Sequence, residues 1–180
     1  MIYEFLSAYC KNKGIKIDII VPIMRGGGVL GVCLSHLFSV IRMYPCQYKF
    51  VRMQKGLDSS TVYAPKLLLS TLGAVENKND SYVVLITEGN HVHGEIAQEC
   101  INLVKNMLPN ARILYACIGC DYAHRAPLAN TSFECCGFTT NETESLTLEE
   151  CRQYHVKEKI VVYPWENLAE ELKEVIESSN

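Results

Sequence analysis

Residues 82–96 constrain the fold of this chain more than any other segment. A continuous apolar run at 82–86 is followed by a polar stretch and then by apolar residues three and four positions apart. A continuous run is typical of a strand covered on both faces in a mainly parallel sheet, and the later spacing predicts a helix that packs back on it. The segment therefore predicts a strand, a loop and a helix in an α/β protein.

The loop of this unit, at residues 88–94, is a candidate binding site. Between the carboxyl end of a strand and the amino end of a helix, unpaired backbone N–H groups meet the positive end of the helix dipole. Such a place suits a phosphate. Many loops of this kind are only connections, so the fold position alone leaves both interpretations open.

The rest of the chain repeats the alternation of strands and helices. Strands are predicted at 17–23, 47–53, 110–118 and 160–163, and helices at 3–10, 29–38 and 166–178, with 62–72 re-entering the sheet. The polar segment 54–61 is predicted to be a mobile loop that closes over a filled site. Alternation of this kind favours a single α/β domain over residues 1–180, with a mainly parallel twisted sheet and helices on both faces.

Composition limits the function classes. The chain has 180 residues, of which 48% are apolar and 21% charged, and its formal net charge is −3. These values are typical of a soluble globular protein and give no sign of a nucleic-acid or membrane surface. No apolar run is long enough to span a bilayer and no signal segment opens the chain, so a cytoplasmic protein with small-molecule or protein partners is expected.

The nine cysteines are an odd number and lie mostly within apolar patterns. In a reducing cytosol such residues behave as small hydrophobic side chains. Cys117 and Cys120, followed by His124, have roughly the spacing of a zinc site, but a Cys-x-x-Cys without a second pair is a weak signal.

A second glycine-bearing loop follows the first predicted strand. Residues 24–28 are predicted to form a tight loop, which contains Arg25, Gly26, Gly27 and Gly28. Glycine lets backbone N–H groups approach a diphosphate closely, and an arginine adds a charge-assisted contact to the same group. The alternative is an ordinary surface arginine beside a turn.

Taken together, three signals resemble one family. Arg25-Gly26-Gly27, the central unit around Gly94 and the closing Tyr163-Pro164-Trp165-Glu166 occur in the order found in type I phosphoribosyltransferases, especially the xanthine-guanine and hypoxanthine branch. The resemblance covers residues 15–166. It implies a transferase that moves phosphoribose from phosphoribosyl pyrophosphate (PRPP) to a nitrogenous base, with Mg²⁺ bound mainly through PRPP.

The resemblance also implies a set of site residues and partners. Pyrophosphate would lie on Arg25, Gly26 and Gly27, and the base against Ile160 and Val161, beneath a hood formed near residues 121–157. The ribose and its phosphate would be bound by the central loop, which consists of Glu88, Gly89, Asn90, His91, Val92, His93 and Gly94. No protein metal ligand is implied, and a homodimer is expected by analogy.

The central loop departs from the family pattern. Glu88 is the one carboxylate where the family has two, and the hydroxyl residues that flank the family glycine are missing. The strand at 110–118 also ends without the family's purine-contacting lysine. His91 and His93 either donate to the phosphate in place of the missing hydroxyls or are exposed loop residues without a role.

Two functions of different class are consistent with this sequence. The first is a phosphoribosyltransferase in which Glu88 serves the catalytic site from the strand end, where its side chain is expected to face solvent. The second is a catalytically degenerate relative that binds a nucleotide or phosphoribosyl ligand as a regulator or complex subunit.

Overall fold

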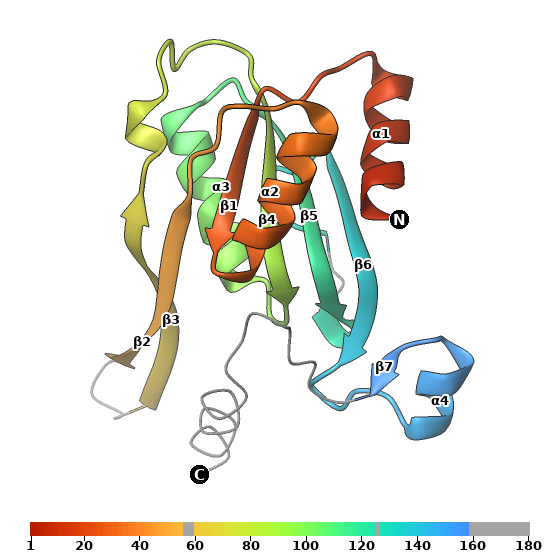
Figure 1. The fold of residues 1–180 in the computed structure, drawn as a ribbon. Helices are drawn as coiled ribbons and strands as arrows, with labels where there is room; N and C mark the ends of the chain where they lie inside the picture. The colour runs from red at the N-terminus through yellow and green to blue at the C-terminus, as the bar shows by residue number, and fades with distance from the viewer. Residues whose placement is uncertain (56–59, 125–126, 159–180) are drawn as a thin grey trace.

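A computed structural model describes residues 1–55, 60–124 and 127–158 of the chain (Figure 1). Within these residues seven strands form one sheet, in the order β3-β2-β1-β4-β5-β6-β7. All neighbouring strands are parallel except β2 and β3. The strands are β1 (Ile19–Met24), β2 (Cys46–Lys55), β3 (Ser60–Ser70), β4 (Val83–His91), β5 (Arg112–Asp121), β6 (Phe133–Asn141) and β7 (Lys157–Glu158). The predicted α/β fold with a mainly parallel sheet is confirmed.

Helices cover both faces of this sheet, as predicted. Figure 1 shows α1 and α2 on one side and α3 on the other. The described helices are α1 (Ile2–Lys13), α2 (Gly26–Phe38), α3 (Glu95–Met107) and α4 (Leu148–Gln153), with 3₁₀ turns η1 (Leu72–Ala74) and η2 (Tyr122–His124). α3 buries Ala97, Cys100, Ile101 and Val104, whose three- and four-residue spacing places them on one helical face.

Strand β4 lies at the centre of the core, and the side chains of its apolar run pack against the helices on both faces of the sheet. Val84 and Ile86 pack in the cluster that contains the buried face of α3. Val83 and Leu85 pack in the opposite cluster, beneath α1 and α2. Alternate side chains of a strand point to opposite faces, so a strand covered on both sides has to be apolar throughout. Each fully buried side chain of this size stabilises the fold by about 1.5–3 kcal/mol.

The amino-terminal unit matches its prediction in most respects. α1 ends at Gly14, which has φ 61°, and β1 and α2 follow as expected. The predicted tight loop at residues 24–28 is wrong, because β1 ends at Met24 and α2 begins at Gly26. Only Arg25 separates strand from helix, and the three glycines form the first turn of α2.

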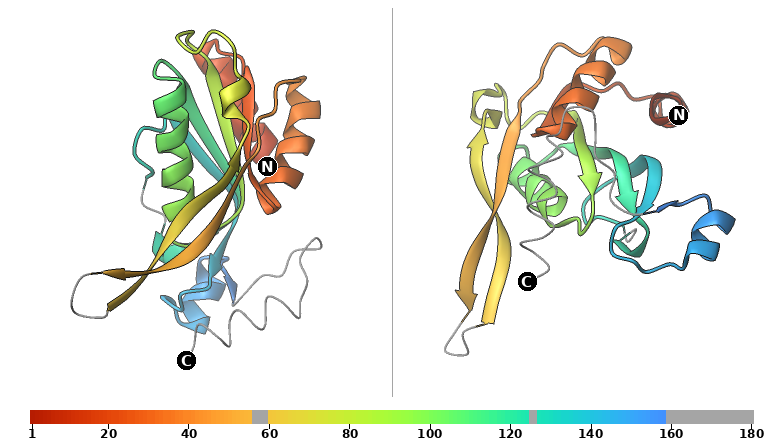
Figure 2. Two further views of the ribbon diagram at one scale, coloured as in Figure 1. Left: turned by 90° about the vertical axis from the view of Figure 1, so that its left-hand side faces the viewer. Right: turned by 60° about the horizontal axis from the view of Figure 1, so that its bottom comes forward.

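The predicted mobile loop at 54–61 is also wrong at both ends, because its first and last residues belong to strands. β2 continues to Lys55 and β3 begins at Ser60, and the two pair as a long antiparallel hairpin; residues 56–59 lie outside the described part of the chain. Figure 2 shows the hairpin extending beyond the body of the molecule. The prediction that residues 62–72 re-enter the sheet is confirmed through Ser70.

The predicted hood near 121–157 contains a strand of the sheet in its middle third. Residues 133–141 form β6, which pairs with β5 inside the sheet, and Phe133 and Cys135 pack against the core. The described residues that follow β6 include α4 and β7, which lie beyond the carboxyl end of β6 in Figure 1. Thr147 and Glu150 form a capping box that starts α4. The predicted strand at 160–163 and helix at 166–178 lie outside the described residues.

Among the residues that the structure describes, no helix is both long enough and apolar enough to span a membrane.

Candidate functional site

The two predicted loops meet at one edge of the sheet. β1 and β4 are adjacent and parallel, with Pro22 opposite Thr87, so the turn after β1 and the end of β4 lie side by side. In Figure 1 the carboxyl ends of β1, β4, β5 and β6 all point towards the same edge. Ligands of open α/β sheets bind at this edge. The structure thus brings Arg25, Gly26 and Gly27 close to Glu88 and Gly89.

The contact between α2 and β4 is unusually close. The Thr87 hydroxyl donates to the Gly27 carbonyl at 2.7 Å. A Cβ built on Gly27 would lie inside contact distance of the Thr87 carbonyl oxygen and 2.9 Å from Glu88 Cα. A Cβ built on Gly89 would lie 2.8 Å from Gly26 Cα. Glycine at positions 27 and 89 is therefore required by packing, independently of any ligand.

The amino end of α2 is suited to an anion. Within the described residues no side chain caps this end, and the first turn carries no acidic residue. Arg25 stands at the N-cap position with an exposed side chain, after a cis peptide bond from Met24. The positive end of the helix dipole and an arginine at one point favour a negatively charged ligand.

The amino end of α3 is less favourable to an anion. Gly94 is its N-cap with φ 75°, a conformation that glycine adopts without strain, and Glu95 occupies the first turn. The loop is also shorter than predicted. β4 continues to His91, so Glu88, Gly89, Asn90 and His91 belong to the strand, and only Val92, His93 and Gly94 connect it to α3. Of the two histidines, His93 is exposed and His91 is buried.

The predicted exposure of Glu88 is wrong. Its side chain is buried, with 8% of the residue exposed, because the sheet continues past it and β5 lies alongside. The Tyr115 hydroxyl donates to Glu88 Oε2, and His91 Nδ1 lies 3.6 Å from the same oxygen. A buried carboxylate needs such partners, since one without them is strongly unfavourable. Replacing Glu88 is therefore expected to affect stability as well as any ligand.

His91 and Tyr115 complete this cluster. His91 Nδ1 lies 2.8 Å from the Tyr115 hydroxyl oxygen, and both side chains are buried. Burial lowers the pKa of His91, but the hydrogen bond and charge of Glu88 outweigh burial and raise it overall above 6.5. Burial, followed by the charge of Glu88, raises the pKa of Tyr115 well above 10. Tyr115 is thus a neutral hydroxyl at physiological pH.

Two polar residues that sequence reasoning missed, Asp121 and Glu142, connect the neighbouring strand ends. Asp121 is fully buried and accepts hydrogen bonds from the backbone N–H groups of Ala123, Glu142 and Thr143 at 3.0, 2.6 and 3.2 Å. Asn90 Nδ2 in turn donates to Glu142 Oε1 at 2.8 Å. These bonds join the ends of β4, β5 and β6. The one sequence signal was an aspartate at the end of an apolar strand.

A hollow of about 310 Å³ lies above the central loop. It is lined by His91, His93, Gly94, Glu95 and Gln98, and across from them by Ala123, Pro127 and Leu128. Of the predicted ribose and phosphate residues, His91, His93 and Gly94 line this hollow. The predicted base contacts Ile160 and Val161 lie outside the described residues.

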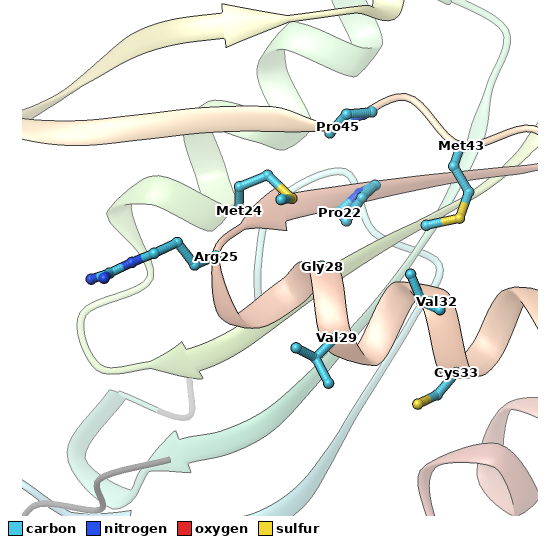
Figure 3. A pocket seen from close by; sticks show the side chains of 9 residues that line it. All are labelled: Pro22, Met24, Arg25, Gly28, Val29, Val32, Cys33, Met43 and Pro45. Atoms are coloured by element: carbon cyan, nitrogen blue, oxygen red, sulfur yellow. The ribbon is translucent and has the colours of Figure 1, made fainter. Parts of the chain in front are cut away.

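A larger hollow of about 580 Å³ lies between α2 and the start of β2. Figure 3 shows Val29, Val32, Met43 and Pro45 around it, with the Arg25 side chain extending away. Its lining is mostly apolar and offers few hydrogen-bond donors, whereas phosphate ligands need several. We therefore place the candidate phosphate site at the sheet edge and not in this hollow.

The predicted zinc alternative gains no support. Among the described residues, no group of three or more His, Cys, Asp or Glu side chains is placed to hold a metal ion. Cys117 lies beside Cys120, and this neighbour together with burial raises the pKa of Cys117 well above 9. The Cys117 thiol is therefore protonated at neutral pH in the metal-free protein.

Comparison with solved structures identifies the fold. A hypothetical protein from Neisseria gonorrhoeae with bound ppGpp matches with a TM-score of 0.66 and 15% identity, over 99% of this chain and 91% of that chain. Purine phosphoribosyltransferase from Pyrococcus horikoshii matches with a TM-score of 0.59 and 20% identity, over 93% and 85%. Xanthine-guanine-hypoxanthine phosphoribosyltransferase from Helicobacter pylori gives 0.52 and 10%, over 74% and 78%.

No protein-family model matches the chain, and no curated protein matches its sequence. The structural matches nevertheless agree with the family that the sequence resembles. The chain has the type I phosphoribosyltransferase fold. At these identities the matches show the fold, and the activity has to be argued from the site.

The close contact between α2 and β4 gives a direct prediction. Gly27→Ala is expected to lower the free energy of unfolding by about 3 kcal/mol or more, because its methyl group has no space against the Thr87 and Glu88 backbone. Urea denaturation followed by circular dichroism measures the change. Gly73→Ala is the matched control, since a Cβ there meets nothing within 4 Å. Equal stability of the two variants would show that the contact is absent.

Proposed function

We propose that this protein is a phosphoribosyltransferase that transfers phosphoribose from PRPP to a purine-like nitrogenous base. In this reaction the bond from the anomeric carbon to pyrophosphate breaks, and a bond to a ring nitrogen of the base forms. One observation carries the proposal: the uncapped, acid-free amino end of α2 lies against the end of β4, at the edge where the family fold binds its substrate.

In this proposal Arg25, Gly26 and Gly27 bind the pyrophosphate. The helix end supplies backbone N–H groups and the arginine supplies a delocalised positive charge, so the group that leaves is stabilised as its charge develops. The phosphate of the ribose is assigned to the hollow over Gly94, where His91 and His93 replace the family's hydroxyls. Glu95 at its rim opposes this assignment electrostatically, so binding there is expected to be weaker than at α2.

Magnesium would enter with the substrate. The described residues contain no cluster of carboxylates for a metal, and Glu88 is already held by Tyr115 and His91. Mg²⁺ commonly keeps most of its ligands as water and substrate phosphate oxygens, so this arrangement fits an ion that PRPP carries. Bound in this way, Mg²⁺ would neutralise part of the pyrophosphate charge.

A second function is favoured by the state of Glu88. To bind ribose hydroxyls, this carboxylate would have to leave the Tyr115 hydroxyl and approach the ligand, and the second family acid is missing. A protein that binds a nucleotide or phosphoribosyl compound without transfer would not need that change. The Neisseria gonorrhoeae structure, which contains ppGpp, is compatible with such a nucleotide-binding role. For either function we propose a cytoplasmic protein without nucleic-acid or membrane partners.

We further propose that the protein forms a homodimer through the outer face of α2. Val29, Val32 and Leu37 are 40%, 49% and 54% exposed, and the helix contains no Asp, Glu, Lys or Arg from Gly26 to Phe38. An uncharged helix face that exposes this many apolar side chains is normally covered. A second copy fits, because two uncharged helices meet without opposing like charges.

The pyrophosphate assignment predicts a loss of affinity in Arg25→Ala. Removing a charged hydrogen bond of about 1.5–3 kcal/mol should weaken PRPP binding roughly 10- to 150-fold in the presence of Mg²⁺. Isothermal titration calorimetry measures the change. Arg42→Ala is the control, because Arg42 lies near Tyr82 at the opposite end of the sheet. Equal affinities for the two variants would rule out this assignment.

A second measurement distinguishes a phosphoribosyltransferase from a protein that only binds the ligand. With PRPP, Mg²⁺ and a panel of purine bases, the transferase is expected to release pyrophosphate in a base-dependent manner. Arg25→Ala provides a background control, because it removes the charge that the pyrophosphate would contact without changing the buried turn. Calorimetric binding of PRPP without release for any base would favour the second function over the first.

The dimer is tested by analytical ultracentrifugation under reducing conditions, which keep the exposed Cys33 reduced. The wild-type protein is expected to sediment as a dimer and Val32→Asp as a monomer, since a charge buried in the contact is unfavourable. Leu148→Asp on α4, where Leu148 is 55% exposed, should remain dimeric. A wild-type protein that sediments as a monomer would contradict the proposed homodimer.

A further inference from the structure

Glu88, Tyr115 and His91 form a buried polar cluster that the proposed transfer reaction does not by itself require. The three residues are 8%, 2% and 4% exposed, respectively. They come from two adjacent strands, Glu88 and His91 from β4 and Tyr115 from β5. Polar groups this deeply buried are unfavourable unless they are paired, so their arrangement calls for a physical explanation.

Counting the hydrogen atoms of the cluster fixes the state of His91. Tyr115 has a single hydroxyl hydrogen, which it donates to Glu88 Oε2. The Tyr115 oxygen can then only accept a hydrogen bond, and the atom 2.8 Å away is His91 Nδ1. Nδ1 must therefore carry a hydrogen. When the ring is neutral and Glu88 is ionised, Nε2 has none.

The other edge of the ring faces the candidate site. His91 Nε2 lies 2.8 Å from the position that a Cβ on Gly94 would occupy, beneath the amino end of α3. His91 also lines the hollow of about 310 Å³ above this point. Nε2 is thus the ring atom nearest to the Gly94 end of that hollow, and Glu88 and Tyr115 hold the ring from behind.

We propose that Glu88 and Tyr115 are positioning residues, which fix the His91 ring and keep its hydrogen on Nδ1 so that Nε2 is the atom presented to a ligand. The neutral ring offers Nε2 as an acceptor or a base, and the protonated ring offers an N–H donor to an oxyanion. Glu88 therefore acts through Tyr115 and His91, and not directly on ribose hydroxyls. The ligand part of this inference rests on the proposed function, whereas the state of the ring does not.

The electrostatics of the cluster agree with this geometry. Burial lowers the pKa of His91, and the hydrogen bond and charge of Glu88 reverse this effect and raise it. Other ionisable groups around the ring are Cys120 on β5, Glu134 on β6, and His93 and Glu95 at the rim of the hollow. Because the folded-state pKa is raised, His91 stabilises the fold below about pH 6.5, and this contribution is lost as the pH rises through the raised pKa.

NMR spectroscopy of the ligand-free protein with ¹⁵N-labelled histidine tests the inference. At a pH above its titration, His91 is expected to show hydrogen on Nδ1 and none on Nε2. Glu88→Gln should shift the titration of His91 to lower pH, because the attracting charge is gone while burial remains. Glu95→Gln is the control, since Glu95 is exposed at the same hollow and solvent screens its charge.

Tyr115→Phe provides a second variant that keeps the ring and its packing. Without the hydroxyl acceptor, the preference for hydrogen on Nδ1 should weaken. A wild-type ring protonated on Nε2, an unchanged tautomer in folded Tyr115→Phe, or equal titrations in folded Glu88→Gln and Glu95→Gln would each overturn the proposal. Failure of the wild-type protein to bind PRPP, with the NMR result as expected, would instead remove the proposed function and leave the positioning of His91 in place.

Discussion

The contact between the first turn of α2 and the backbone of β4 is the constraint on which the rest of the site depends. Thr87 donates to the Gly27 carbonyl, and neither Gly27 nor Gly89 has space for a side chain. Because the helix lies directly on the strand, its positive end comes to the edge where β4 also ends. A side chain at either glycine would separate the two elements. The same packing that stabilises the fold thus assembles the candidate anion site.

The amino ends of α2 and α3 form the two halves of the candidate site, and they differ in electrostatic character. At α2 an arginine and an acid-free first turn favour a negative group. At α3 a glutamate stands in the first turn, and the positive charge nearby is the titratable His91, which Glu88 keeps basic from within the core. Binding strength is therefore expected to come mainly from the first half, with the second half more sensitive to pH.

Much of the fold could be predicted from the sequence, because the spacing of apolar residues indicates which side chains are buried. The apolar run of β4 and the spacing along α3 each describe one buried surface, and both were found in place. Less of the site could be predicted. The burial of Glu88 depends on how far β4 and β5 pair, and its partner Tyr115 is 27 residues away in the chain. The polar residues 54–55 and 60–61 resembled part of a loop, but they pair with each other across the antiparallel hairpin of β2 and β3. Long-range pairing, and not local pattern, decided these cases.

Amide NMR spectroscopy during titration with PRPP and Mg²⁺ tests the central claim most directly, since it locates the ligand residue by residue. If the carboxyl edge is the site, the backbone amide signals of Gly26, Gly27 and Gly28 should shift, together with those of His93, Gly94 and Glu95, and the first group should respond at lower ligand concentration. Shifts confined to other parts of the molecule, or none at millimolar PRPP, would contradict the account.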